Sequence, residues 1–174
     1  MKRSLNGVIS LIAFAFLSGC APVISRELSQ QIDTSINFKS VFEKPESFRN
    51  EMVLWGGVIV SSRNLKEGTL IEILQKPLGY GNEPSAGDYS EGRFLALFDG
   101  YLDTAVYAKD REVTVAGVVQ GRRMQRLDEI EYAYPLIAVK ELHLWAERTE
   151  IQPEPYIFYP FPYRFPHYRH FYHR

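Results

Sequence analysis

Short runs of β-branched and aromatic residues, separated by turn residues, fill the middle of the chain and most restrict its possible folds. Five such runs occupy residues 52–61, 69–75, 93–98, 112–120 and 136–145. Runs of this length and composition, bounded by Gly, Pro, Asn and Asp, predict β-strands. The first two are expected to pair as a hairpin, because a turn-like segment at residues 64–68 separates them. The chain is therefore expected to form a mainly all-β domain.

The order of the predicted elements favours one small barrel. A helical turn is predicted at residues 101–107, between the third and fourth runs. Three strands, a short helix and two strands form the order of the OB barrel, a small, nearly closed sheet. Gly56 and Gly57 predict a bulge or a sharp bend in the first strand, as such a barrel requires. Pro135 is expected at a strand start or a corner, not inside a central strand. A β-sandwich is the alternative, although it usually needs about seven strands.

Two further segments adjoin the predicted strands. Apolar residues spaced by three and four at Phe38, Val41 and Phe42 predict a short helix that ends before Pro45. This helix is expected to cap the core of the barrel. A membrane-surface helix is the alternative, but the acidic residues beside it oppose contact with an anionic bilayer. Residues 77–92 form a loop longer than compact domains usually carry, and such loops are often functional.

The N-terminus has the three parts of a secretion signal. Lys2 and Arg3 precede an apolar stretch at residues 8–17, and small residues follow it. The apolar stretch is too short to cross a bilayer, which takes about 20 residues. The sequence Leu17-Ser18-Gly19-Cys20 resembles the lipobox of bacterial lipoproteins. That resemblance implies cleavage between Gly19 and Cys20, diacylglycerol on the Cys20 thiol and an acyl chain on the new amino group; an ordinary signal peptide with a chance cysteine is the alternative.

These features divide the chain into four parts. Residues 1–19 are the predicted signal peptide, and 20–36 are a flexible, lipidated tether. Residues 37–146 are the OB-like barrel domain, and 147–174 are a disordered tail rich in Pro, His and aromatic residues. With one cysteine, the chain has no intramolecular disulfide.

The charge of the mature chain opposes one class of partner. The chain has 20 Lys and Arg against 21 Asp and Glu, and the signal peptide takes Lys2 and Arg3 with it. A nucleic-acid-binding domain usually has a basic excess, so no nucleic-acid partner is expected.

Several segments resemble one family of envelope proteins. They are WGGVI at 55–59, IEILQKPL at 71–78, GRFLA at 92–96, VTVAGVVQG at 113–121 and YPLIAVKELHLW at 134–145. With the lipobox, they are similar to the starvation-inducible outer-membrane lipoprotein (Slp) family over roughly residues 1–146, with the tail outside the resemblance. The resemblance implies an outer-membrane lipoprotein associated with carbon starvation, stationary phase or acid stress, without an assigned enzymatic activity. In Gram-negative lipoproteins an Asp after the cysteine typically retains the protein at the inner membrane. Ala21 follows Cys20 here, so the resemblance implies sorting to the outer membrane. We expect the protein at the periplasmic face of that membrane.

The residues offer little catalytic chemistry. We predict no catalytic residue, no metal site and no cofactor beyond the covalent lipid on Cys20. Two groups of acidic residues, Asp99 with Asp103 and Asp128 with Glu129 and Glu131, are the alternative: they would serve a periplasmic enzyme acting on cell-wall or surface glycans. The tail histidines His167, His170 and His173 have metal-binding spacing but no acidic or thiol partner nearby.

Three arginines form the predicted binding surface. Arg122, Arg123 and Arg126 are expected on the connection between the fourth and fifth strands, which often borders the ligand face of OB domains. A solvated loop paired with Asp128 and Glu129 is the alternative. We expect a non-catalytic envelope binding or support module, with the outer-membrane bilayer as one partner and an anionic glycan, a lipid headgroup or another envelope protein as the other. The aromatic and arginine residues of the tail suit adhesion to such surfaces.

Overall fold

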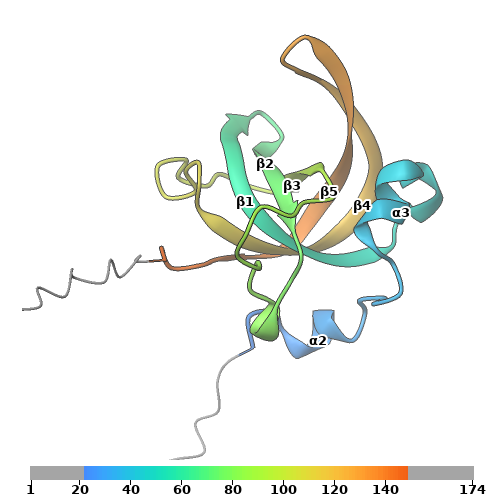
Figure 1. Ribbon diagram of the computed structural model, residues 1–174, viewed down its shortest axis with the longest axis vertical. Coiled ribbons are helices and arrows are strands. Elements are labelled where there is room, and N and C mark those ends of the chain that lie inside the picture. Colours follow the sequence, from blue (N-terminus) through green and yellow to red (C-terminus); the bar gives the residue numbers. More distant parts are fainter. Residues whose placement is uncertain (1–21, 149–174) are drawn as a thin grey trace, which may run out of the picture.

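Five strands close into a barrel in the computed structural model, which describes residues 22–148 (Figure 1). The strands are β1 (Met52–Leu65), β2 (Gly68–Lys76), β3 (Arg93–Phe98), β4 (Glu112–Leu127) and β5 (Ile130–Leu144). They follow the order β1-β2-β3-β5-β4, and only the β3–β5 pair is parallel. The predicted all-β, five-stranded OB-like barrel is confirmed.

β4 and β5 run beyond the barrel as a two-stranded ribbon, whose tip bends toward the β1–β2 hairpin in Figure 1. In this ribbon, residues Gly121 to Leu127 pair with Leu136 to Ile130. The connection between the two strands is therefore only Asp128 and Glu129. The prediction that Arg122, Arg123 and Arg126 lie on a connection is wrong, because all three lie within β4.

Pro135 also lies inside a strand, contrary to expectation. It is the sixth residue of β5 and pairs with Arg122 of β4. β3 pairs with β5 only at residues 136–138, so β5 has a single neighbour at Pro135. A strand with one free side tolerates a residue that cannot donate a ladder hydrogen bond.

β1 bends where it passes from one neighbour to the other. Its first half pairs with β4 and its second half with β2, and only Gly56, Gly57 and Val58 pair with both. A Cβ on Gly57 would lie 2.0 Å from the Leu74 carbonyl oxygen, so the two backbones approach closely. The predicted bend is thus present, but the register shift of β1 lies between Ile59 and Ser61, beyond the glycines.

A short helix, α3 (Phe38–Glu43), closes one end of the barrel as predicted. Phe38 and Val41 are buried, and the Phe38 ring lies 4.8 Å from that of Trp55. The Asn37 side chain accepts the Ser40 N–H at 2.8 Å and caps the helix. The α-helix ends just before Pro45, which begins the 3₁₀ turn η1 (Pro45–Phe48).

The predicted helix at residues 101–107 is a single turn. The N–H groups of Val106 and Tyr107 both donate to the carbonyl of Asp103. The Asp103 side chain also accepts the Ala105 N–H at 2.8 Å. Such a hydrogen bond stabilises a single turn and not a longer helix.

The described part of the predicted tether packs against the barrel. It contains α2 (Arg26–Ser29), and Ile24 before it is 3% exposed. The Ser25 N–H donates to the Glu141 carboxylate on β5 at 2.7 Å. No helix among residues 22–148 is long and apolar enough to cross a membrane.

Candidate ligand-binding face

A second apolar cluster lies outside the barrel, on the outer side of β2, β3 and β5. Side chains alternate along a strand, so Leu70 and Leu95 point outward while their neighbours Ile71 and Phe94 fill the core. Leu70, Leu95 and Tyr134 are nevertheless at most 2% exposed. The cluster also contains Leu65, Leu97, Tyr132 and Leu136. The outer side of the sheet is therefore partly covered by the chain itself. We call the outer side of β2, β3 and β5, where this cluster lies, the concave face.

The concave face contains a small polar cavity of about 110 Å³. Leucines of β2 and β3 lie among polar side chains from β1, β2 and β4; the lining is Ser61, Arg63, Leu70, Glu72, Leu95, Gln125 and Arg126. A volume of this size accommodates a few water molecules or one small polar group of a larger ligand.

Glu72 is the centre of a hydrogen-bond network in this cavity. One of its carboxylate oxygens accepts from Arg93 at 2.8 Å and from the Tyr134 hydroxyl at 3.1 Å. The other accepts from the Ser61 hydroxyl at 3.3 Å. Burial, together with the negative charge of Glu72, raises the pKa of Tyr134 to about 12, and Glu72 also raises the pKa of Arg93. The network therefore ties β1, β2, β3 and β5 together and uses the carboxylate as an acceptor.

The arginines predicted as one cluster point to different places. Alternation along β4 separates Arg123 from Arg122 and Arg126. Arg123 pairs with Glu67 in the β1–β2 turn at 2.9 Å, and Arg122 lies 3.7 Å from Glu46 of η1. Of the three, only Arg126 is among the residues that line the cavity; it is exposed, and its side chain forms no hydrogen bond or ion pair with the other residues from 22 to 148.

Arg63 is the residue that sequence reasoning missed. Its guanidinium donates to the Gln125 side chain at 2.6 Å, across the concave face from β1 to β4. Arg63 and Gln125 are 62 residues apart in the sequence. Strand alternation through the second half of β1 was the only available signal, and it assigns a face but not a partner.

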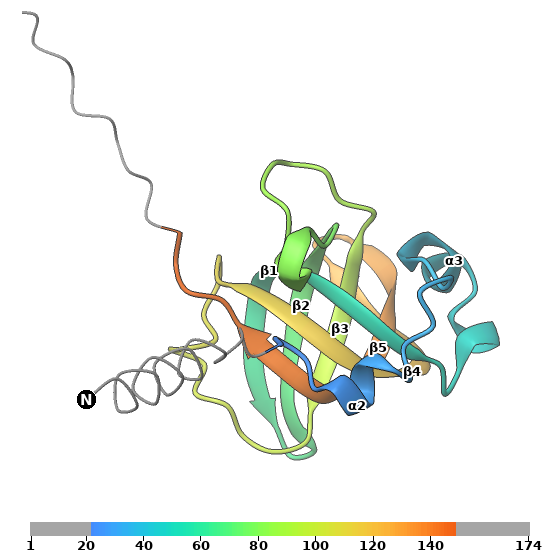
Figure 2. The same ribbon diagram turned by 90° about the horizontal axis from the view of Figure 1, so that it is seen from below.

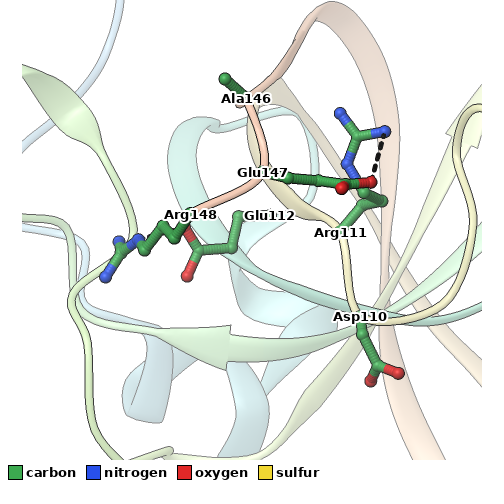
Figure 3. Close-up of a pocket in the computed structure, with 6 residues that line it drawn as sticks. All are labelled: Asp110, Arg111, Glu112, Ala146, Glu147 and Arg148. Carbon is green, nitrogen blue, oxygen red and sulfur yellow. Dashed lines mark ion pairs between the residues drawn. The ribbon is translucent and has the colours of Figure 1, made fainter. Parts of the chain in front are cut away.

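A second hollow, of about 260 Å³, lies just past the C-terminal end of β5, beside the start of β4 (Figure 3). Asp110, Arg111, Glu112, Ala146, Glu147 and Arg148 line it. Arg148 lies 2.9 Å from Glu112, and Arg111 lies 3.8 Å from Glu147. Arg111 also donates to the Trp145 carbonyl at 2.9 Å. These contacts fasten the segment after β5 to the start of β4.

The acidic residues considered for catalysis do not line either hollow. Asp103 stabilises a turn, Asp128 and Glu129 form the exposed tip of the ribbon, and Asp99 and Glu131 are exposed. In the hollow of Figure 3, two of the three carboxylates are paired with arginines.

Some of the remaining candidate residues lie outside the residues that the structure describes. Within 22–148, no three His, Cys, Asp or Glu side chains gather as a metal site, and the His143 ring packs edge-on against Trp145 at 4.6 Å. Leu17, Ser18, Gly19 and Cys20 lie outside the residues that the structure describes, as do His167, His170 and His173.

The fold and the face together define a small OB-like β-barrel domain with a polar cavity on its outer side. The sequence model of the Outer membrane lipoprotein Slp family matches residues 17–172, and the chain belongs to this family. It is an outer-membrane lipoprotein. The match corrects the extent of the resemblance, because it continues through most of the C-terminal segment instead of ending near residue 146.

Two relatives from Escherichia coli (strain K12) are similar over most of their length. The chain is 24% identical over 156 residues to "Uncharacterized lipoprotein YeaY", which covers 88% of this chain and 80% of the relative. It is also 24% identical over 143 residues to "Outer membrane protein Slp". This match covers 81% of this chain and 76% of the relative. Among solved structures, a putative aspartyl-tRNA synthetase from Leishmania major Friedlin matches with a TM-score of 0.38 and 12% identity, and the chain spans 27% of it.

Proposed function

We propose that the protein is a non-catalytic binding module, anchored through Cys20 at the periplasmic face of the outer membrane, whose concave face binds an acidic group of an envelope glycan. The observation that supports this proposal is the polar cavity between residues of β1, β2, β3 and β4, with Arg63 and Arg126 in its lining. The chain has one cysteine, so a lipoprotein of this sequence has one position for its thioether lipid.

The donors of the cavity match an acidic sugar. Guanidinium groups bind carboxylates and phosphates through paired, charge-assisted hydrogen bonds. Arg126 has no partner within residues 22–148, and Arg63 uses one nitrogen on Gln125. Ser61 and Gln125 supply hydroxyl and amide groups suited to sugar hydroxyls. The Glu72 carboxylate already accepts hydrogen bonds from Ser61, Arg93 and Tyr134, so it needs no hydrogen bond from the ligand.

The absence of catalysis is part of the proposal. Two carboxylates of the hollow in Figure 3 are paired with arginines, and the family match brings no named activity. A link to starvation or stress rests on the resemblance to the Slp family. We propose that binding supports the envelope under those conditions.

Binding to acidic envelope glycans tests this proposal. The probes are isolated peptidoglycan sacculi and phosphorylated lipopolysaccharide, with cosedimentation of the mature protein as the measurement. Loss of one charge-assisted hydrogen bond costs about 1.5 kcal/mol, so Arg126→Gln should weaken Kd about tenfold. Arg122→Gln is the matched control, because Arg122 lies on the same strand but pairs with Glu46 outside the cavity.

Two outcomes would contradict the proposal. If both substitutions weakened glycan binding equally, or if neither glycan bound, the concave face would not be the binding site. Release of sugar fragments during incubation with purified protein would support the glycan-cleaving alternative.

A further inference from the structure

Tyr80 is a fully exposed aromatic residue on a loop with fixed geometry. It begins the 3₁₀ turn η2 (Tyr80–Asn82) and is 102% exposed. The Gly79 N–H donates to the Glu83 carbonyl at 2.7 Å, and the buried Thr114 hydroxyl of β4 donates to the Asn82 carbonyl at 2.7 Å. Tyr80 is thus held away from the barrel by bonds at both sides of its turn.

The N-terminal end of the described chain lies beside this loop. One hollow is lined by Pro22, Ile24 and Arg26 together with Asn82 of η2. The burial of Ile24 and the Ser25–Glu141 hydrogen bond fix this end to the barrel. Figures 1 and 2 both show η2, in green, near the start of the described chain, in blue.

Covalent geometry limits how far the lipid attachment can be from this end. Cys20 precedes Pro22 by two residues, and an extended chain spans at most about 3.6 Å per residue. The two Cα atoms are therefore within about 7 Å of each other. The leaflet that holds the acyl chains must lie close to Pro22, and hence to the η2 loop.

The C-terminal end of the described chain adjoins the same loop. Arg148 lies 3.2 Å from Glu83 and lines a hollow together with Gly79 and Tyr80. The sequence that follows, residues 151–174, contains nine Phe and Tyr residues and three Arg. Tyrosine and cationic side chains are enriched at membrane interfaces, where a ring meets both apolar and polar surroundings.

We propose that the end of the molecule formed by α2 and the η2 loop faces the phospholipid leaflet that holds the lipid anchor, with the Tyr80 ring in its interfacial layer. This orientation rests on the proposed anchoring at Cys20. Charge is balanced here, since Glu27 follows Arg26 and Glu83 pairs with Arg148, so the contact depends on the aromatic ring more than on net charge. Figure 1 places the tip of the β4–β5 ribbon at the opposite end of the long axis from α2. The ribbon and its concave face are then presented to the aqueous space.

Depth-dependent fluorescence quenching tests the orientation. The lipidated mature protein is reconstituted into phosphatidylethanolamine–phosphatidylglycerol vesicles whose acyl chains carry bromine. Tyr80→Trp and Ile130→Trp are compared with the wild type, which supplies the background from Trp55 and Trp145. Ile130 is a suitable control because it is 59% exposed at the far end of the ribbon. We expect a blue shift and a loss of the added emission for Tyr80→Trp, and neither for Ile130→Trp.

The outcomes separate orientation from anchoring. Vesicle flotation measures anchoring alone, and a protein that does not float refutes the role of Cys20. A floating protein with equal quenching at the two positions, or with stronger quenching at residue 130, overturns the proposed orientation. Persistence of the Tyr80→Trp quenching in high salt is expected, because the contact is not primarily electrostatic.

Discussion

Substitution of Gly57 tests the close approach that bends β1. An alanine Cβ at this position would lie 2.0 Å from the Leu74 carbonyl oxygen and 2.8 Å from the Ile73 side chain. The nearest atom belongs to the backbone of β2, so β1 and β2 must separate. Overpacking typically costs about 1–3 kcal/mol, and a lost ladder hydrogen bond adds about 1 kcal/mol.

We therefore expect Gly57→Ala to lower the free energy of unfolding by about 3 kcal/mol, and Gly57→Val by at least as much. For a domain of this size, that corresponds to a Tm about 12 °C lower in thermal unfolding followed by circular dichroism. Gly79→Ala is the control, because its Cβ would meet no atom closer than 3.5 Å. A Gly57→Ala protein with the Tm of the wild type would refute the close-approach explanation of the bend.

Three further predictions address the anchor, the tail and the acidic pH range. Cys20→Ser should abolish incorporation of labelled fatty acid and leave an uncleaved or mislocalised precursor; normal labelling would refute lipidation at this residue. Ending the chain after Glu150 should leave thermal unfolding nearly unchanged, because Trp145 still donates to Thr114 at 2.9 Å; a large fall in Tm would show that the tail stabilises the barrel. The Arg49 hydrogen bond lowers the pKa of Glu46 below its usual 4.5, so its stabilising contribution is present above pH 4.5 and lost as the pH falls through the folded-state pKa. Glu46→Gln should therefore lose less stability than the wild type between pH 5 and pH 3; identical acid profiles would contradict this assignment.

Local sequence predicted most of the barrel but not its ribbon. The runs at β1, β2 and β3 have a buried, apolar side that a strand period reveals. In the second half of β4, Arg122, Met124 and Arg126 are exposed while Arg123 and Gln125 are half-buried polar residues. A segment with polar residues on both sides has no apolar alternation, and it therefore resembles a loop in the sequence.

The candidate site depended even more on long-range pairing. The predicted binding arginines included Arg126, which lines the cavity, but grouped it with two residues that pair elsewhere. Glu72 and Tyr134, which organise the cavity, are 62 residues apart in the chain. Neither belongs to a recognisable motif, because each is one polar or aromatic residue in an otherwise ordinary strand.

The sequence by itself determined the cellular localisation and the class of fold. A lipobox is a contiguous pattern read by processing enzymes along the chain, and strand periodicity is a local consequence of which residues must be buried. Only the tertiary structure decided that β1 meets β2 too closely for a Cβ at Gly57, that Arg63 and Arg126 line one cavity, and that both described ends of the chain lie beside the η2 turn. These relations arise from barrel closure, which brings distant segments together according to strand register and ribbon curvature, and no local pattern encodes either one.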